Sequence, residues 1–246
     1  MTLDVNDLAY WYPRINRAPG IKTPATEIIH TDAQLFDLLD GRLPDGYHQF
    51  LGDLNAAAER ISPLAGADSR LAPVFLRTGH GSGKHSWSRT CWVADRNHLA
   101  AHVAELVQWS AMCDLPVTTW AVRARLPIQP LFICEAYRDL PVAREFRLFV
   151  EAGYVTHIQP YWPAAAIEQG RPDHPDWPAL LEQAGRLTGA EWEQLRAMAI
   201  TAVTAIGEGD WSVDFMQTVD GRWYLIDMAQ AERSYRYEPD QMYAVR

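Results

Sequence analysis

Residues 73–87 read Pro73-Val-Phe-Leu-Arg77-Thr-Gly79-His-Gly81-Ser-Gly83-Lys84-His-Ser-Trp87, a short apolar strand that leads into three alternating glycines and one lysine. Of the 22 Lys and Arg residues in the chain, only Lys22 and Lys84 are lysines. A compact ammonium group beside the backbone N–H groups of a glycine-rich loop is suited to binding a phosphate. The stretch therefore predicts a phosphate-binding loop or, alternatively, an ordinary flexible β-hairpin.

The loop departs at two positions from the phosphate-loop pattern G-x-x-x-x-G-K-[ST]. Thr78 stands at the position of the first glycine, and His85 stands at the position of the serine or threonine. The apolar residues before the loop and those in 86–93 instead predict two strands. We expect a glycine-tipped hairpin that can fold down over a nucleotide.

Composition limits the classes of protein that this chain can be. With 246 residues, 48% of them hydrophobic, it can bury the core of one large domain or of two small ones. The formal net charge of -9 repels a phosphodiester backbone and weighs against non-specific binding of nucleic acid. Cys91, Cys113 and Cys134 are odd in number and form no C-x-x-C pair, which indicates neither a disulfide framework nor a zinc site.

No apolar run approaches the roughly twenty residues that a membrane helix requires. The N-terminal residues have early acidic side chains and no apolar core of signal-peptide length. We therefore expect a cytoplasmic protein with no membrane partner.

Local patterns predict secondary structure along the whole chain. In the first part they indicate a helix over 35–39 capped by Asp32, a polar linker over 62–72, a helix over 99–110 capped by Asp95, and strands over 131–135 and 144–150. In the second part they indicate a hairpin around Ala152-Gly153, a helix from the capping box Thr188-Gly-Ala-Glu191 to Gly207, and a hairpin of 211–218 and 222–228 around Asp220-Gly221.

The last hairpin carries one carboxylate on each strand. Antiparallel pairing would bring Asp214 and Asp227 side by side, an unfavourable arrangement of like charges in the absence of a cation. Two hard oxygen ligands facing nucleotide phosphates are typical of a Mg²⁺ site. The alternative is a pair of exposed acids on a solvated hairpin, which the apolar neighbours of both residues make the weaker interpretation.

Taken in order, these segments resemble the ATP-grasp superfamily over residues 70–238. The resemblance rests on the glycine-rich hairpin, Leu131-Phe-Ile-Cys-Glu135-Ala-Tyr137, Arg144-Glu145-Phe-Arg147, Asp214 and Leu225-Ile-Asp227. The chain is most similar to the clade of predicted phage and bacterial RNA ligases and cell-division-cycle assembly chaperones of translation initiation, which share the Glu-Phe-Arg strand and a segment like Ile21-Lys-Thr-Pro-Ala-Thr.

The resemblance implies an α/β (α+β) ATP-grasp fold in which two lobes clasp ATP between antiparallel sheets. A small N-terminal α/β segment, residues 1–68, would precede the ATP-grasp domain of residues 69–246. Within that domain, lobe one would span about 69–136 and lobe two about 137–246.

The resemblance also implies a role for each matching residue. The backbone of Cys134, Glu135, Ala136 and Tyr137 would recognise adenine, and the ribose would bind near Glu145. Arg77 and Lys84 would bind the phosphates, and Arg147 would contact the γ-phosphate or its acceptor. Asp214 and Asp227 would bind Mg²⁺. Lys84 and Arg147 would be the catalytic residues. The cofactors would be ATP and Mg²⁺.

Two residues depart from the family pattern. Many relatives have an asparagine metal ligand two positions after the second carboxylate, where this chain has Ala229. The second metal position therefore lacks its usual ligand, and Gln230 or Glu232 could replace it. Arg77 stands where many relatives have a lysine, which keeps the charge and adds a bidentate fork.

The implied function is an ATP- and Mg²⁺-dependent ligase that activates a carboxylate or a phosphate for attack by a nucleophile. The acceptor would be an RNA end, a peptide or a small amino acid. The competing interpretation is a non-catalytic assembly chaperone that binds ATP and grips a protein partner. Three further features stay open between a site and ordinary surface or packing: His80 and His85, four tryptophans (Trp87, Trp92, Trp109 and Trp120), and the tail arginines Arg233 and Arg236.

Overall fold

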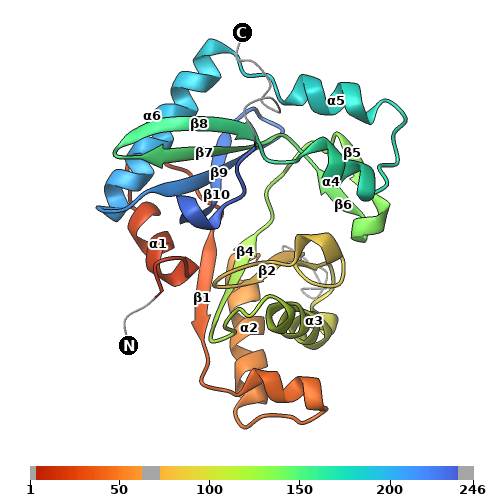
Figure 1. The fold of residues 1–246 in the computed structure, drawn as a ribbon. Coiled ribbons are helices and arrows are strands. Elements are labelled where there is room, and N and C mark those ends of the chain that lie inside the picture. The colour runs from red at the N-terminus through yellow and green to blue at the C-terminus, as the bar shows by residue number, and fades with distance from the viewer. Residues whose placement is uncertain (1–3, 63–72, 238–246) are drawn as a thin grey trace.

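The computed structural model describes residues 4–62 and 73–237 and contains two four-stranded antiparallel sheets, each with its own helices and core (Figure 1). One sheet lies in the lower half of Figure 1 and the other in the upper half. We call these halves the lower and the upper lobe. No helix in the described ranges is long and apolar enough to cross a membrane.

The lower lobe contains the strand that opens the glycine-rich stretch. Its sheet has the order β1-β4-β2-β3, formed by β1 (Thr26–His30), β4 (Thr119–Ala124), β2 (Val74–Thr78) and β3 (Trp92–Val93). Two helices, α2 (Tyr47–Ile61) and α3 (Leu99–Met112), pack their apolar faces on this sheet. Phe50 of α2 contacts Trp120 of β4 edge-on, with ring centroids 5.3 Å apart, so Trp120 is a core residue.

The upper lobe carries both predicted carboxylates. Its sheet has the order β10-β9-β7-β8, formed by β10 (Trp223–Gln230), β9 (Trp211–Gln217), β7 (Glu145–Glu151) and β8 (Tyr154–Pro160). The helices α6 (Gly189–Ile206) and α1 (Leu8–Ile15) cover one face and share its core. The predicted capping box of Thr188 and Glu191 is present, and Gly207 ends α6 in the left-handed conformation, as expected.

A third, smaller unit lies beside the upper lobe (Figure 1). It pairs β5 (Phe132–Cys134) with β6 (Leu140–Val142), and α4 (Ala164–Gln169) and α5 (Trp177–Ala184) lie against this pair. Its buried residues form a core separate from the other two. The strand predicted over 131–135 therefore belongs to neither large sheet.

Three sequence expectations need correction. Only Trp92–Val93 is extended in the predicted strand 86–93, because a 3₁₀ turn (Lys84–Ser86) and further turns occupy the residues before it. The helix expected after Asp32 is a 3₁₀ helix over Leu35–Asp40, and Gln34 precedes it without a side-chain cap. Asp95 caps a 3₁₀ turn that leads into α3 rather than α3 itself.

The expected N-terminal segment is divided between the lobes. Strand β1 pairs with β4 in the lower sheet, whereas α1 lies in the core of the upper lobe. Most of the predicted linker over 62–72, and the boundary at residue 68, lie outside the described residues.

The two hairpins of the upper sheet set the positions of its charged residues. Asp227 of β10 pairs with Asp214 of β9, and Asp214 also pairs with Arg147 of β7. Alternation along β7 places Phe146, Leu148 and Val150 in the core and turns Arg147 to the opposite face. The carboxylates therefore lie side by side, as predicted, but it is a β-bulge between Leu225 and Asp227, which the sequence did not indicate, that brings Asp227 opposite Asp214.

The capping box of α6 gives a pH-dependent prediction. Although partial burial opposes ionisation, hydrogen bonds from Arg144 and Thr188 lower the pKa of Glu191 from 4.5 to about 2. A lowered folded-state pKa adds stability above the ordinary value, and that stability is lost as pH falls toward about 2. We expect Glu191→Gln to lower the free energy of unfolding by about 1 to 2 kcal/mol at neutral pH, and by much less near pH 2.

Urea unfolding of both proteins at neutral and acid pH measures this difference. An equal loss at both pH values would contradict the assignment of the low pKa to Glu191.

Candidate functional site: a cationic cavity between the lobes

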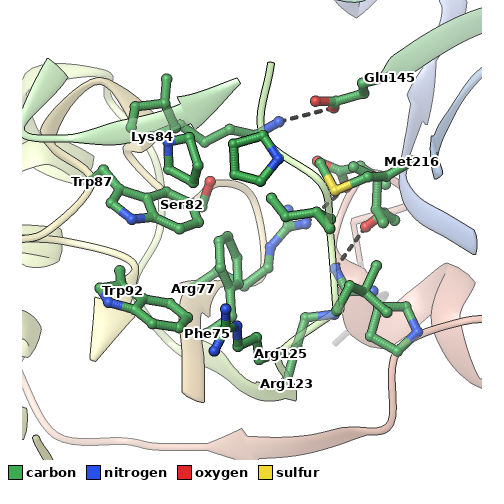
Figure 2. Close-up of a pocket in the computed structure, with 18 of the residues that line it drawn as sticks. Phe75, Arg77, Ser82, Lys84, Trp87, Trp92, Arg123, Arg125, Glu145 and Met216 are labelled. Atoms are coloured by element: carbon green, nitrogen blue, oxygen red, sulfur yellow. Dashed lines mark hydrogen bonds and ion pairs between the residues drawn. The ribbon is translucent and has the colours of Figure 1, made fainter. Parts of the chain in front are cut away.

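A cavity of about 330 Å³ lies between the two lobes (Figure 2). Of the residues predicted for the site, Arg77, Lys84, Glu145 and Asp227 line it. Figure 2 shows Lys84, Trp87 and Trp92 on one side and Glu145 and Met216 on the other. Elements from both lobes therefore form the wall, as the two-lobed arrangement requires.

Three ion pairs connect the charged residues in and next to this wall. Lys84 Nζ lies 3.0 Å from Glu145 Oε1, and Arg77 Nη1 lies 2.9 Å from Asp227 Oδ1. Arg147 holds Asp214 with two bonds, of 2.7 Å from Nε and 2.8 Å from Nη2. The first two pairs join residues far apart in sequence that come from opposite lobes.

The pair of Lys84 and Glu145 is buried: the Glu145 side chain is 1% exposed and that of Lys84 is 21% exposed. Burial raises the pKa of Glu145, even though the ammonium group of Lys84 opposes this rise. Burial also disfavours charged Lys84, but the Glu145 carboxylate outweighs this and holds the pKa of Lys84 above its ordinary value. Lys84 is therefore a firmly charged cation at the edge of the cavity.

Arg147 and Asp214 form the most constrained pair. The Asp214 side chain is 4% exposed, and both of its oxygens accept hydrogen bonds from the Arg147 guanidinium. Although burial opposes it, Asp214 holds the pKa of Arg147 above its ordinary value. Neither residue lines the cavity directly, and both lie beside Glu145 and Asp227 on the upper sheet.

Arg123 is a site residue that the sequence analysis missed. It extends from β4 into the cavity wall, where Nε donates to Thr26 Oγ1 and Nη1 donates to the Ile226 carbonyl. Its Nη2 is buried and, within the described residues, has no hydrogen-bond partner. Burial, with the charge of Arg77 nearby, lowers the pKa of Arg123 to about 10.

A buried guanidinium with an unused donor at a cavity wall is suited to an anion. The sequence did carry a signal for Arg123, since it is a lone cation in the apolar strand Trp120-Ala-Val-Arg123. That signal is weak, because alternation along a strand can equally point an arginine to solvent.

Aromatic rings form a second part of the wall. Trp87 and Trp92 are stacked with centroids 5.7 Å apart and planes at 10°, and Phe75 lies 5.8 Å from Trp87. Arg125 lies 5.4 Å over the Trp92 ring. These rings line the cavity, whereas Trp109 and Trp120 pack in the lower core. Two of the four tryptophans are therefore available to a ligand, and the other two are packing residues.

The segment expected to recognise adenine lies elsewhere. Cys134, Glu135, Ala136 and Tyr137 do not line the cavity. The N–H groups of Glu135 and Ala136 already donate to the carbonyls of Arg171 and Gly170. Because β5 pairs with β6 and not with the lower sheet, the chain has left the lower lobe before residue 132.

The chain instead leaves the lower lobe directly after β4, which is the last strand of the lower sheet in sequence order. We call the segment that follows β4 the crossing. Arg125, Leu126 and Ile128 of this crossing line the cavity, together with Ala124 at the end of β4. The crossing therefore precedes the lobe boundary expected near residue 136, and its residues line the cavity whereas residues 134–137 do not.

The glycine-rich loop is held by several contacts. Thr78 N donates to the Gly81 carbonyl, Thr90 Oγ1 donates to the Gly83 carbonyl, and Trp87 N donates to the Tyr137 carbonyl. Gly81 lies against the Trp109 indole, where an added Cβ would be 2.3 Å from a ring carbon. These contacts place Lys84 at the cavity.

Gly81→Ala is therefore expected to destabilise the protein by about 1 to 3 kcal/mol, because the new methyl group must displace the Trp109 ring. Gly52 of α2 is the matched control: a Cβ there meets nothing within 4 Å, and alanine favours a helix by about 0.5 to 1 kcal/mol. Thermal unfolding of both variants measures the two effects. Equal melting temperatures for Gly81→Ala and the wild type would contradict the tight packing of this loop.

The remaining candidates lie away from the cavity. His80 faces Asp4 and Asp7 of the N-terminal segment, and His85 packs on the Tyr137 ring. Arg236 pairs with Glu151 and lies over Phe149. None of these side chains lines the cavity, and neither does Arg233.

The donor set determines whether Mg²⁺ fits here. Both Asp214 oxygens are engaged by Arg147, whereas Asp227 lines the cavity with 38% of its side chain exposed. Gln230 is bound through its side chain and its N–H to Asn6, and Glu232 does not line the cavity, so neither replaces the asparagine missing at Ala229. No group of three or more His, Cys, Asp or Glu in residues 4–62 and 73–237 is arranged to hold a metal.

Mg²⁺ needs only one or two protein carboxylates when nucleotide phosphates and water supply its other ligands. The exposed face of Asp227 fits an ion of that kind. The residues do not fit a site built from protein ligands alone.

Comparison with known proteins identifies the fold. No protein-family model and no curated protein matches the chain. The structure of C-terminally truncated Cdc123 from Schizosaccharomyces pombe matches with a TM-score of 0.55 and 11% identity, over 91% of this chain and 82% of that one. The VanG D-Ala:D-Ser ligase from Enterococcus faecalis matches with a TM-score of 0.53 and 14% identity, over 96% of this chain and 56% of that one.

At these identities the likeness concerns the fold alone. The chain has an ATP-grasp-like fold of mixed helices and antiparallel sheets, as the sequence predicted.

Proposed function

We propose that the chain is an ATP-dependent ligase that binds ATP in the cavity between its lobes. The supporting observation is the charge of the wall: among the described residues that line it, Arg77, Lys84, Arg123 and Arg125 face three carboxylates, those of Asp139, Glu145 and Asp227. Four cations against three carboxylates leave one positive charge, and Arg123 Nη2 is unpartnered within the described residues. A triphosphate supplies the missing anion, and the aromatic wall accepts the flat base.

The chain's own residues would position the reacting groups and neutralise their charge. Arg77 and Arg123 would bind the inner phosphates, and Lys84 would contact the terminal phosphate. Arg147, beside Glu145 on the upper sheet, would face the γ-phosphate or the acceptor. Phosphoryl transfer needs little covalent chemistry from the protein, so these cations would account for most of the rate.

Mg²⁺ fits as a partner of the nucleotide rather than of the protein alone. Asp227 would hold it, and when bound it supplies positive charge to the phosphate oxygens. The acceptor's carboxylate or phosphate would then be activated and attacked by a nucleophile.

Two observations favour a second candidate, a non-catalytic ATP-binding assembly factor. The fold resembles Cdc123 about as closely as it resembles a ligase. Ala229 lacks the oxygen ligand of the family pattern, and Gln230 is held by Asn6. A protein that binds nucleotide without cleaving it needs fewer metal ligands.

Product analysis separates the two candidates. The protein is incubated with ATP, Mg²⁺ and a panel of amino acids, dipeptides and 5′-phosphorylated RNA, and nucleotides are quantified by chromatography. Acceptor-dependent ADP indicates an acyl-phosphate route, and AMP indicates an adenylate. Binding of ATP without either product with any acceptor would contradict the ligase proposal and favour the assembly factor.

A further inference from the structure

Lys84 reaches from the lower lobe into a box of three side chains on the upper lobe. Its Nζ lies 3.0 Å from Glu145 Oε1, 4.0 Å from the Tyr161 ring centroid and 5.4 Å from the Trp162 ring centroid. A carboxylate with flanking aromatic faces is the chemistry that recognises an ammonium group. We call Glu145, Tyr161 and Trp162 the ammonium box.

The ammonium box is built without Lys84. Glu145 begins β7, and Tyr161 and Trp162 directly follow β8. The Tyr161 N–H donates to the Glu145 carbonyl at 2.9 Å, which fixes the two residues relative to each other. Glu145 and Trp162 line the cavity, and both are nearly fully buried.

Glu145 has unused capacity to accept a hydrogen bond. Only its Oε1 contacts Lys84, while Oε2 is buried and, in the described ranges, has no hydrogen-bond partner. A buried polar atom without a partner costs stability and marks a place where a ligand group would be bound. The box is therefore only partly satisfied by Lys84.

In the proposed function, contact of Lys84 with the ATP phosphates draws its ammonium group out of the box. When Lys84 turns to the nucleotide, the buried Glu145 carboxylate loses its ion pair, and the nearby charge of Arg147 makes no hydrogen bond to it within the described residues, which is unfavourable. An acceptor that carries an ammonium group restores the lost pairing. The terminal phosphate of an RNA would instead bring a second anion against Glu145.

We propose that the ammonium box binds the ammonium group of a primary-amine acceptor after Lys84 has moved to the nucleotide, so that the acceptor is an amino acid or a peptide. This inference rests on the proposed function, because bound nucleotide is what draws Lys84 away. It predicts ordered binding, with ATP first and the amine second. Lys84 then acts as the internal occupant of the acceptor site when nucleotide is absent.

The test measures binding of a simple amine by titration calorimetry. Propylammonium chloride is the probe, propan-1-ol is the neutral control, and a non-hydrolysable ATP analogue with Mg²⁺ is present or absent. We expect propylammonium to bind at least about tenfold more tightly when the analogue is bound, and propan-1-ol to show no such change. Glu145→Gln should abolish the difference.

A second arm does not depend on nucleotide. Lys84→Met empties the ammonium box, so this variant should bind propylammonium without the analogue. Lys22→Met, which removes the other, exposed lysine, should not.

If the analogue fails to bind the wild type, the proposed function fails while the Lys84→Met experiment still tests the box. If the analogue binds but amine affinity changes neither with it nor in Lys84→Met, the box is not an acceptor site. Binding of 5′-phosphorylated RNA to the analogue complex without an effect of propylammonium would also overturn the proposal.

Discussion

Arg147→Met is expected to lower the free energy of unfolding by about 3 to 5 kcal/mol, because it leaves the Asp214 carboxylate buried without its cation. Both Asp214 oxygens accept hydrogen bonds from Arg147, and the Asp214 side chain is 4% exposed. Among the described residues, the nearby cavity cations Arg77 and Lys84 do not bond to Asp214, because Arg77 holds Asp227 and Lys84 holds Glu145. Urea unfolding at neutral pH measures the loss.

The double variant Arg147→Met with Asp214→Leu is the control for this effect. Replacing both charges by apolar groups of similar size removes the uncompensated carboxylate, so most of the lost stability should return. A loss below about 1 kcal/mol in the single variant would mean that water reaches Asp214 and that the pair behaves as a surface ion pair.

Lys84→Met is expected to reduce ATP turnover by a factor of about 100 to 1,000 while changing ATP affinity much less, because Lys84 would neutralise charge that develops mainly in the transition state. In the absence of nucleotide Lys84 contacts Glu145 and the Tyr161 ring. It must give up these contacts to reach bound ATP, so the new contact with ATP adds little to ATP affinity. Nucleotide titration and initial rates at saturating ATP separate the two effects.

Lys22→Met is the matched control for Lys84, since these are the two lysines of the chain and Lys22 is exposed. This variant should keep both rate and affinity. Weaker ATP binding with an unchanged rate in Lys84→Met would make Lys84 a tether, and equal rates in both variants would remove it from the mechanism.

The parts of the site that the sequence predicted depend on local pairing. The Asp220-Gly221 turn sets the register in which Leu225 pairs with Phe215. A β-bulge between Leu225 and Asp227, which the sequence did not indicate, then brings Asp227 rather than Ile226 opposite Asp214. Alternation along β7 likewise turns Arg147 toward Asp214. Helix α6 was predictable for the same reason, because its capping box and its terminal glycine are adjacent in sequence to the helix that they limit.

The parts that the sequence missed depend on contacts between distant segments. A short apolar run such as Phe132–Cys134 reads as a strand in any sheet, and only its pairing with β6 shows that it lies beyond the crossing between the lobes. Arg123 is a site residue because β4 lies beside both β1 and β2, and the contact of Lys84 with Glu145 spans 61 positions. No local pattern encodes these neighbours.

Titration of the protein with ATP in the presence of Mg²⁺, followed by calorimetry and by thermal unfolding, tests the central claim that the cavity is an ATP site. The account predicts saturable binding of one ATP per chain and a stabilisation of about 2.7 kcal/mol when free ATP is a hundredfold above its Kd. Arg123→Met should weaken binding, because it removes the buried donor that has no protein partner within the described residues. An unchanged melting temperature and no heat of binding at millimolar ATP would contradict the account.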